Sequence, residues 1–160
     1  MKKVKVITVS DSSFENKRED LSGKVTKDFL EDEFEVGDID IIPDEKNIIK
    51  EKLLKYSNEN YDIIITTGGT GFSKRDVTPE ATLEVIEKRA FGIEIAMMTS
   101  SLKITPFAML SRAICGIVNK SLIINLPGSP KAAKENLEVI KPALEHAVKM
   151  INTKKGQMHS

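Results

Sequence analysis

The sequence predicts an α/β fold, a three-layer α/β/α sandwich around a mostly parallel sheet with one short antiparallel strand. Short β-branched apolar runs alternate along the chain with segments of helical periodicity, the pattern typical of a parallel sheet covered by helices. A glycine-rich turn joins one of these runs to a helix start. The 160 residues suit one hydrophobic core. We therefore expect a single domain over residues 1–153 and a flexible tail over residues 154–160.

The first half of the chain alternates strand and helix signals. A strand over Val4–Val9 ends in a polar loop that begins at Ser10, and a helix opens at Ser22-Gly23. A short strand over Asp38–Ile42 then turns, at Pro43-Asp44-Glu45, into a second helix. The expected inward-facing residues are Leu21, Val25 and Phe29 in the first helix and Ile49, Leu53 and Tyr56 in the second.

The second half repeats the alternation and then departs from it. The apolar run that ends at Ile65 predicts a buried strand, and Thr78-Pro79-Glu80 predicts a helix start with Thr78 as N-cap. Next we expect a helix from about Ile93, with Met97 on its inner face, and a short helix over Phe107–Leu110. An antiparallel strand pair over Ala113–Val118 and Ser121–Leu126 should follow. The final helix should be capped by Ser129 and kinked or split at Pro142.

A glycine-rich loop follows the central strand. Its glycines, Gly68, Gly69 and Gly71, permit positive φ and close approach of a ligand to the backbone. It matches neither a P-loop, because no Gly-Lys-Ser/Thr follows, nor a dinucleotide fingerprint, because Lys74 stands where the last glycine belongs. A simple tight turn is the alternative, but the neighbouring hydroxyls favour a binding loop for an anion or a flat polar molecule. The hydroxyls belong to Thr66, Thr67 and Thr70.

Four separate segments follow the predicted strands at their carboxyl ends. They contain Asp11, Asp44, Gly68–Gly71 and Pro127–Ser129. Because ligands of open α/β sheets bind at this edge, we expect the four segments to form one pocket. Asp11, Asp44 and Asp76 could hold a hard cation through oxygen, although local capping or turn formation explains Asp11 and Asp44 equally well when each is taken singly. This composition suits a metal-bound polyphosphate.

Composition excludes several classes of protein. The 24 basic residues balance the 24 acidic residues, so no basic excess indicates nucleic acid as a partner. The single cysteine, Cys115, excludes an internal disulfide and a cysteine-based zinc site, and its apolar neighbours indicate a packed thiol. No signal peptide and no apolar run near 18 residues is visible, which predicts a cytoplasmic protein that does not bind membranes.

Four motifs, in order and spacing, resemble the MogA/MoaB family of molybdenum cofactor biosynthesis proteins, whose domain recurs in gephyrin. These motifs are Thr66–Gly71, Arg75–Ala81, Ser111-Arg112 and Leu126–Pro130. The resemblance extends from Val6 to about Ile151. It implies an α/β/α sandwich that assembles as a homotrimer. It also implies transfer of AMP from ATP to the terminal phosphate of molybdopterin, with Mg²⁺, before metal insertion.

The resemblance assigns roles to matched positions. Asp44 and Asp76 match the two acids considered essential in the adenylyltransferase branch, and both are expected to bind Mg²⁺, with Asp11 as a further candidate ligand. The residues expected to bind nucleotide and pterin substrate are Asp11, Ser12, Ser22, Gly23, Thr66, Thr67, Gly68, Gly69, Thr70, Gly71, Arg75, Ser111, Leu126, Pro127, Gly128 and Ser129. Since the attacking phosphate is already ionised, no catalytic histidine is required; His146 and His159 are expected to be solvated or packed.

Three functions stay open at this stage. The first is the adenylyltransferase, which the Arg75–Pro79 form of the motif favours. The second is a non-catalytic MoaB-type protein that carries molybdopterin without using ATP. The third is a scaffold module like the gephyrin domain, ranked last because the sequence offers no linker or partner module. Molybdopterin and ATP are the expected ligands, with a transient contact to the metal-insertion enzyme of the same pathway. The apolar residues Met97, Met98, Phe107 and Met109 suit self-association or a packed core.

Overall fold

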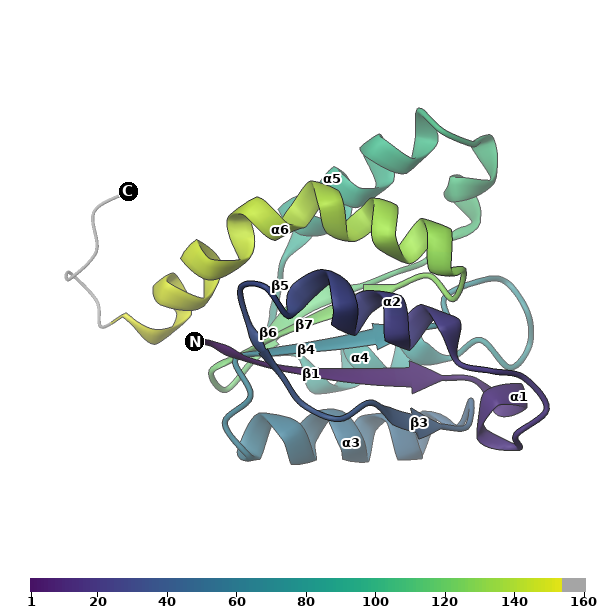
Figure 1. Ribbon diagram of the computed structural model, residues 1–160, viewed down its shortest axis with the longest axis horizontal. Helices are drawn as coiled ribbons and strands as arrows, with labels where there is room; N and C mark the ends of the chain where they lie inside the picture. Colours follow the sequence, from purple (N-terminus) through teal and green to yellow (C-terminus); the bar gives the residue numbers. More distant parts are fainter. Residues whose placement is uncertain (154–160) are drawn as a thin grey trace.

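The computed structural model describes residues 1–153, so the predicted tail over 154–160 lies outside the described residues. A seven-stranded sheet forms the middle layer, with helices on both faces (Figure 1). Its strand order is β2-β1-β4-β7-β6-β5, and β3 pairs with β1 beyond the end of β2. The strands are β1 (Lys3–Val9), β2 (Glu35–Val36), β3 (Asp40–Ile42), β4 (Ile63–Thr67), β5 (Lys88–Arg89), β6 (Cys115–Val118) and β7 (Ser121–Leu126).

The sheet is mostly parallel, as predicted. Strand β1 pairs in parallel with β2, β3 and β4, and β4 pairs in parallel with β7. Strand β6 is antiparallel to both β7 and β5, so among the described strands it alone runs against the others. Each parallel strand of the centre therefore ends at the same edge, where the arrowheads of β1 and β4 point in Figure 1.

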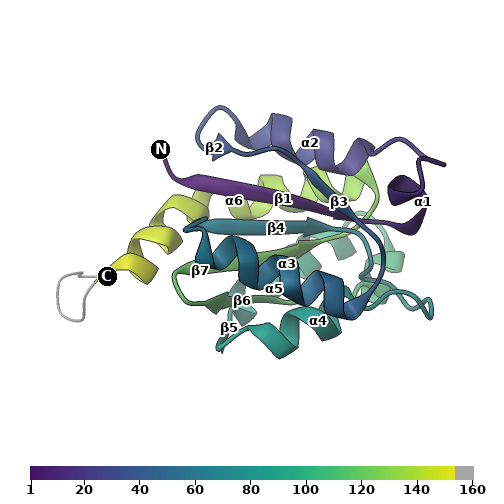
Figure 2. The same cartoon turned by 90° about the horizontal axis from the view of Figure 1, so that it is seen from below.

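Helices cover the two faces of the sheet in two sets. Helices α2, α5 and α6 pack together on one face, and α3 and α4 pack together on the other, which is the nearer face in Figure 2. The helices are α1 (Asp11–Phe14), α2 (Leu21–Leu30), α3 (Lys46–Asn58), α4 (Thr78–Val85), α5 (Phe91–Leu102), the 3₁₀ helix η1 (Pro106–Leu110) and α6 (Pro130–Asn152). None of the helices within residues 1–153 has the length and apolar character needed to cross a membrane.

Strand β4 shows why both faces are apolar. Ile63 and Ile65 pack with α2 and α6 residues, whereas Ile64 packs with α3 residues such as Ile49 and Leu53. All five of these side chains are fully buried. A strand that alternates between two covered faces has no polar side, which explains the continuous apolar run in the sequence.

The inner stripe predicted for α2 was wrong at Leu21, which is 52% exposed, and right at Phe29, which is partly buried against the core. The buried residues of the helix are Ser22, Gly23, Thr26 and Leu30. The cause is the cap: the Asp20 carboxylate accepts from the Gly23 N–H at 2.9 Å, so the helix begins at Leu21 and Ser22 faces the sheet. The polar inner positions are satisfied by hydrogen bonds rather than by apolar packing.

Other element boundaries also differ from the predictions. The N-cap of α4 is Val77 rather than Thr78, because the Thr78 hydroxyl is buried and donates to the Gly68 carbonyl at 3.0 Å. Helix α6 does not split at Pro142, since its buried stripe continues on both sides of the proline through Ile140 and Leu144. Strand β2 was not predicted, and the strand expected from Asp38 begins at Asp40.

Candidate functional site

The loops that follow β1, β3, β4 and β7 meet at one edge of the sheet. The Asp11 N–H donates to Asp44 Oδ2 at 2.9 Å, and the Asp44 N–H donates to Asp11 Oδ1 at 3.0 Å. The Gly68 N–H donates to the Leu126 carbonyl at 3.0 Å. A Cβ placed on Gly128 would lie 3.3 Å from the Gly68 Cα. The four predicted segments are therefore in mutual contact.

The turn after β4 needs glycine at two positions. Gly68 has φ of 93° and Gly69 has φ of 71°. A Cβ on Gly68 would lie 2.3 Å from the Val9 carbonyl oxygen, and a Cβ on Gly69 would lie 2.3 Å from Thr78 Oγ1. Any side chain at either position would be both strained and in collision.

The same turn presents unused backbone donors. The N–H groups of Gly69, Thr70 and Gly71 donate to no other atom of the chain between residues 1 and 153. Successive N–H groups in such a turn form a concave site for anions. The start of α6 lies next to it, with Ser129 as N-cap and Pro130 as first residue. The local structure thus supplies two sets of donors for phosphate oxygens.

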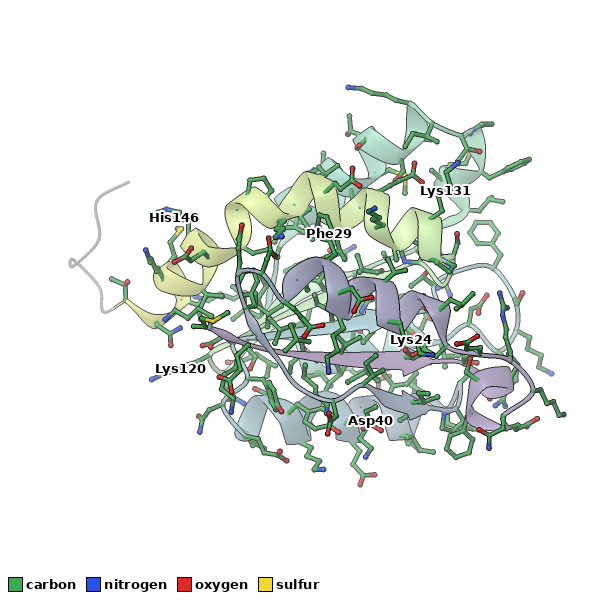
Figure 3. All side chains as sticks on the ribbon, in the orientation of Figure 1. Lys24, Phe29, Asp40, Lys120, Lys131 and His146 are labelled. Carbon is green, nitrogen blue, oxygen red and sulfur yellow. The ribbon has the colours of Figure 1, made fainter. Side chains whose placement is uncertain are left out.

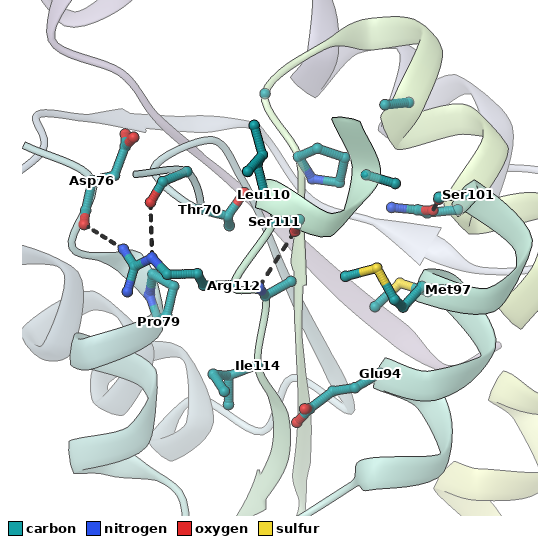
Figure 4. Close-up of a pocket in the computed structure, with 18 of the residues that line it drawn as sticks. Thr70, Asp76, Pro79, Glu94, Met97, Ser101, Leu110, Ser111, Arg112 and Ile114 are labelled. Carbon is teal, nitrogen blue, oxygen red and sulfur yellow. Dashed lines mark hydrogen bonds between the residues drawn. The ribbon is translucent and has the colours of Figure 1, made fainter. Parts of the chain in front are cut away.

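Two pockets open on this edge. The larger, with a volume of about 920 Å³, extends from the glycine turn to α5, η1 and α6 and is lined mostly by apolar side chains (Figure 4). The smaller, of about 360 Å³, lies between the glycine turn, the loop after β1 and the start of α6. Gly69, Asp76 and Gly128 line both pockets, so the two spaces meet at these residues.

Most of the predicted site residues line one of the two pockets. They are Ser22, Asp44, Thr67, Gly68, Gly69, Thr70, Gly71, Asp76, Ser111, Pro127, Gly128 and Ser129. The others lie just behind: Thr66 accepts from Asn125 within the core, Gly23 packs against Asp20, and Leu126 contributes the carbonyl that holds Gly68. Ser12 contacts the Ser10 hydroxyl, and neither Asp11 nor Arg75 lines a pocket.

Arg75 braces the acidic loops instead of pointing at a pocket. Its Nε and Nη2 donate to the two Asp11 carboxylate oxygens at 2.9 and 3.0 Å, and Nη2 also donates to Glu45 at 3.0 Å. These hydrogen bonds lower the pKa of the Asp11 carboxyl and raise the pKa of Arg75. Asp11 therefore stays ionised and fixes the position of the Asp44 backbone.

Asp44 is in the opposite situation. Burial raises its pKa above the ordinary range, and the negative charges of Asp11 and Asp76 raise it further, against the lowering effect of the Asp11 N–H bond. Asp44 and Asp76 line the same small pocket. A divalent cation beside these two carboxylates would remove the repulsion, and phosphate oxygens would complete its shell of oxygen ligands.

The three-acid cation site expected from sequence is not formed as a cluster. Among residues 1–153, no group of three or more His, Cys, Asp or Glu side chains is arranged to hold a metal ion. The Asp11 carboxylate is engaged by Arg75, which leaves the pair of Asp44 and Asp76. These two carboxylates both line the smaller pocket.

Arg112 is a residue of the site that sequence reasoning missed. Its Nε donates to the Gly71 carbonyl and its Nη2 to the Asp76 carbonyl, each at 2.8 Å (Figure 4). Its Nη1 pairs with Glu80. The side chain thus holds the glycine-rich segment against the start of α4. The available signal was its place in the Ser111-Arg112 motif, where only Ser111 was assigned a role.

Among residues 1–153, no histidine lines either pocket. His146 is exposed near the carboxyl-terminal end of α6, at the opposite end of the molecule from α1 (Figure 3). This agrees with the expectation that it is solvated, whereas His159 lies outside the described residues. The polar groups that do line the two pockets include backbone donors, hydroxyls, carboxylates and the guanidinium groups of Arg18, Arg89 and Arg112.

Comparison with known proteins supports the resemblance noted above. A family model described as "Probable molybdopterin binding domain" matches residues 5–146. Gephyrin from Dictyostelium discoideum is 53% identical over 114 residues, which is 71% of this chain but only 16% of that protein. The molybdopterin adenylyltransferase of Helicobacter pylori strain J99 is 43% identical over 151 residues, covering 91% of this chain and 85% of that enzyme.

A solved structure supports the same conclusion. The molybdopterin biosynthesis enzyme MoaB from Thermus thermophilus superposes with a TM-score of 0.90 at 40% identity, over 96% of this chain and 98% of the other. By sequence and by fold, the chain belongs to the MogA/MoaB family of molybdopterin-binding domains.

Proposed function

We propose that this chain is a molybdopterin adenylyltransferase, which transfers AMP from Mg-ATP to the terminal phosphate of molybdopterin and releases pyrophosphate. The observation that carries the proposal is the meeting of two unlike pockets at Gly69, Asp76 and Gly128. Two substrates whose phosphates must react need two spaces with a common junction. The name and 43% identity of the Helicobacter relative support the same reaction.

The larger, mostly apolar pocket suits the pterin, and the smaller, hydroxyl-rich pocket suits nucleotide phosphates. A phosphate oxygen of molybdopterin attacks the α-phosphorus of ATP. The bond from that phosphorus to the bridging oxygen breaks, and pyrophosphate leaves with the electron pair. Because a phosphate monoester is largely ionised at neutral pH, no side chain has to remove a proton.

The chain's own contribution is alignment and stabilisation of charge. The free N–H groups of Gly69–Gly71 and the N-terminal turn of α6 bind phosphate oxygens at fixed positions. Asp44 and Asp76 would hold Mg²⁺, which when bound supplies positive charge to the phosphate oxygens. Donors that are already in place need no reorganisation during the reaction, which is what lowers the barrier.

The direct test is to incubate the purified protein with molybdopterin and Mg-ATP and to measure pyrophosphate and adenylyl-molybdopterin. Formation of both, in equal amounts, supports the adenylyltransferase. Molybdopterin binding without pyrophosphate would instead indicate the carrier function. Absence of both binding and turnover would leave the scaffold function.

We also propose that the protein assembles as a homotrimer and acts in the cytoplasm, where it contacts the metal-insertion enzyme of the pathway. Helix α5 and η1 expose an unusual amount of apolar surface for a monomer. Phe107 is 76% exposed, Ile95 62% and Met109 61%. This surface supports self-association, which light scattering of the purified protein would measure directly.

A further inference from the structure

One polar side chain in the larger pocket has no part in the reaction proposed above. Asn136, on α6, is only 8% exposed, and its remaining exposed surface lines this pocket. Its Oδ1 accepts a hydrogen bond of 2.6 Å from the hydroxyl of Ser101, on α5. The amide is therefore held in one orientation by a residue from a different helix.

The amide nitrogen of Asn136 has no partner in the described part of the chain. The bond from Ser101 accounts for Oδ1 alone, and no other hydrogen bond of this side chain exists within residues 1–153. Nor is any fully sealed side-chain nitrogen or oxygen in that range without a partner, so Nδ2 keeps contact with the pocket space. A nearly buried amide with two unused donors is unfavourable unless a ligand or water accepts from it.

The position of this amide fits one end of an elongated ligand. Ser101 and Met97 lie on the α5 side of the pocket, across from Asp76 and Arg112 (Figure 4). A ligand whose phosphate lies beside Asp76 would place its far end near Ser101 and Asn136. Met97 and Met98 line that end and provide adaptable apolar contacts for a flat ring.

We propose that Asn136, oriented by Ser101, determines specificity for the pterin ring by donating from Nδ2 to the C4 carbonyl oxygen. The inference rests on the proposed function for the identity of the ligand, a 2-amino-4-oxo pteridine. The carbonyl oxygen is the strongest acceptor on that ring. A buried donor discriminates strongly against a ring that lacks the acceptor, because the donor is then left unpaired.

The test compares two phosphate-free rings and one isosteric variant. The probes are 6-hydroxymethylpterin, which carries the C4 carbonyl, and its 2,4-diamino analogue, which carries an amino group there. Binding is followed by quenching of pteridine fluorescence. We expect the unaltered protein to prefer the pterin by about tenfold or more. Asn136→Asp keeps an oxygen for Ser101 but replaces the donor with an acceptor, so the preference should reverse.

Controls separate the role of the amide from effects on folding or charge. Glu138→Gln changes one charge at an exposed position of the same helix that does not line the pocket, and the preference should not change. If Asn136→Asp fails to fold, Asn136→Ala serves instead: it should weaken pterin binding about tenfold and leave the diamino analogue unaffected.

Failure of this inference and failure of the proposed function give different results. If the folded Asn136→Asp variant keeps the original preference, the assignment of Asn136 is wrong even though adenylylation proceeds. The same conclusion follows if the unaltered protein binds both rings equally. If the unaltered protein neither binds pterin nor releases pyrophosphate from molybdopterin and ATP, the proposed function itself is wrong.

Discussion

Asp11 and Asp44 exchange hydrogen bonds with each other's backbone, yet their carboxyl groups are affected in opposite directions. Arg75 lowers the pKa of Asp11, whereas burial and neighbouring acids raise the pKa of Asp44. The difference assigns different tasks to two residues of the same type. Asp11 positions the loop, and Asp44 carries the charge that a bound cation would compensate.

The first prediction concerns the two acids proposed to hold Mg²⁺. Asp44→Asn and Asp76→Asn should each lower the rate of adenylylation by on the order of a hundredfold, because charge on the phosphate oxygens is no longer stabilised. Circular dichroism should show an intact fold. Asp28→Asn, at an exposed position of α2, is the matched control and should be fully active. Normal turnover in both site variants would remove these acids from the mechanism.

The second prediction follows from the sign of the Asp44 shift. Because the pKa of Asp44 is raised in the folded state, the native protein binds more protons than the unfolded chain between the two pKa values. Asp44 therefore destabilises the metal-free protein increasingly as the pH rises from its unfolded-state pKa, about 4, through its higher folded-state pKa. Asn at this position can still accept from the Asp11 N–H. Asp44→Asn should therefore be more heat-stable than the unaltered protein at neutral pH, although its adenylylation is slower. Thermal melting at several pH values, without Mg²⁺, measures the difference.

A third prediction concerns the single cysteine. Cys115 is fully buried in β6, and burial raises the pKa of its thiol to about 12. Since the thiolate is the reactive form, native protein at pH 8 should react with iodoacetamide far more slowly than denatured protein. Mass spectrometry of both samples gives the two rates. Equal rates would show that β6 opens readily to solvent.

At the scale of single elements, the segment from β4 through the glycine turn to α4 combines the most constraints. The turn has two residues of positive φ, Gly68 and Gly69, and N–H groups with no partner among residues 1–153. The buried Thr78 hydroxyl donates to the Gly68 carbonyl and fixes its position. Each feature depends on the others, since Thr78 occupies the space that a side chain on Gly69 would need. The binding surface is therefore a property of the turn as a unit.

The fourth prediction tests this unit with two glycines. Gly68→Ala should destabilise the protein by about 2–4 kcal/mol, because a Cβ would meet the Val9 carbonyl and the left-handed backbone disfavours alanine. Gly92→Ala is the control: it lies in α5 with no atom within 4 Å of the added Cβ, so it should be neutral or stabilise by up to about 1 kcal/mol. Urea denaturation gives both values. Similar stability of the two variants would contradict the constrained turn.

The elements differ in how well the sequence predicts them. Strands β1, β4 and β7 are buried almost throughout, and their β-branched residues predict a buried strand directly. The sequence therefore predicted these three strands correctly. The inner face of α2 was not predicted correctly, because two of its buried residues are polar. The Ser22 hydroxyl donates to Thr67 and the Thr26 hydroxyl donates to the Ser22 carbonyl, and a search for apolar periodicity does not detect such residues. Likewise, Thr78 is not the N-cap of α4 as expected, because its hydroxyl donates to the Gly68 carbonyl instead.

At the scale of the whole molecule, topology explains why distant segments form one site. Parallel strands bring the loops after β1, β3, β4 and β7 to the same edge, so convergence could be predicted from the order of strands and helices alone. Side-chain direction at that edge could not. Asp11 and Arg75 pair with each other, and Arg112 holds two carbonyls of the loop between β4 and α4. Such pairing between loops depends on distances that no sequence pattern contains.

The fifth prediction concerns assembly. If the apolar surface of α5 and η1 forms subunit contacts, Met109→Asp should lower the association constant at least about tenfold, because burying the unpaired carboxylate is costly. Met109 lines neither pocket, so ligand binding by the subunit tests whether the variant is intact. Leu54→Asp, an equivalent change on α3, should leave association unchanged. Sedimentation equilibrium of both variants distinguishes these outcomes.

Arg112 lies two residues beyond the end of η1, and its guanidinium donates to the Gly71 and Asp76 carbonyls of the glycine-rich segment. A displacement of η1 would therefore be transmitted mechanically to the phosphate-binding turn over a single side chain. If copies of the chain associate through η1, their contacts would bear on the geometry of this turn, and the turnover of each subunit should then depend on the degree of association.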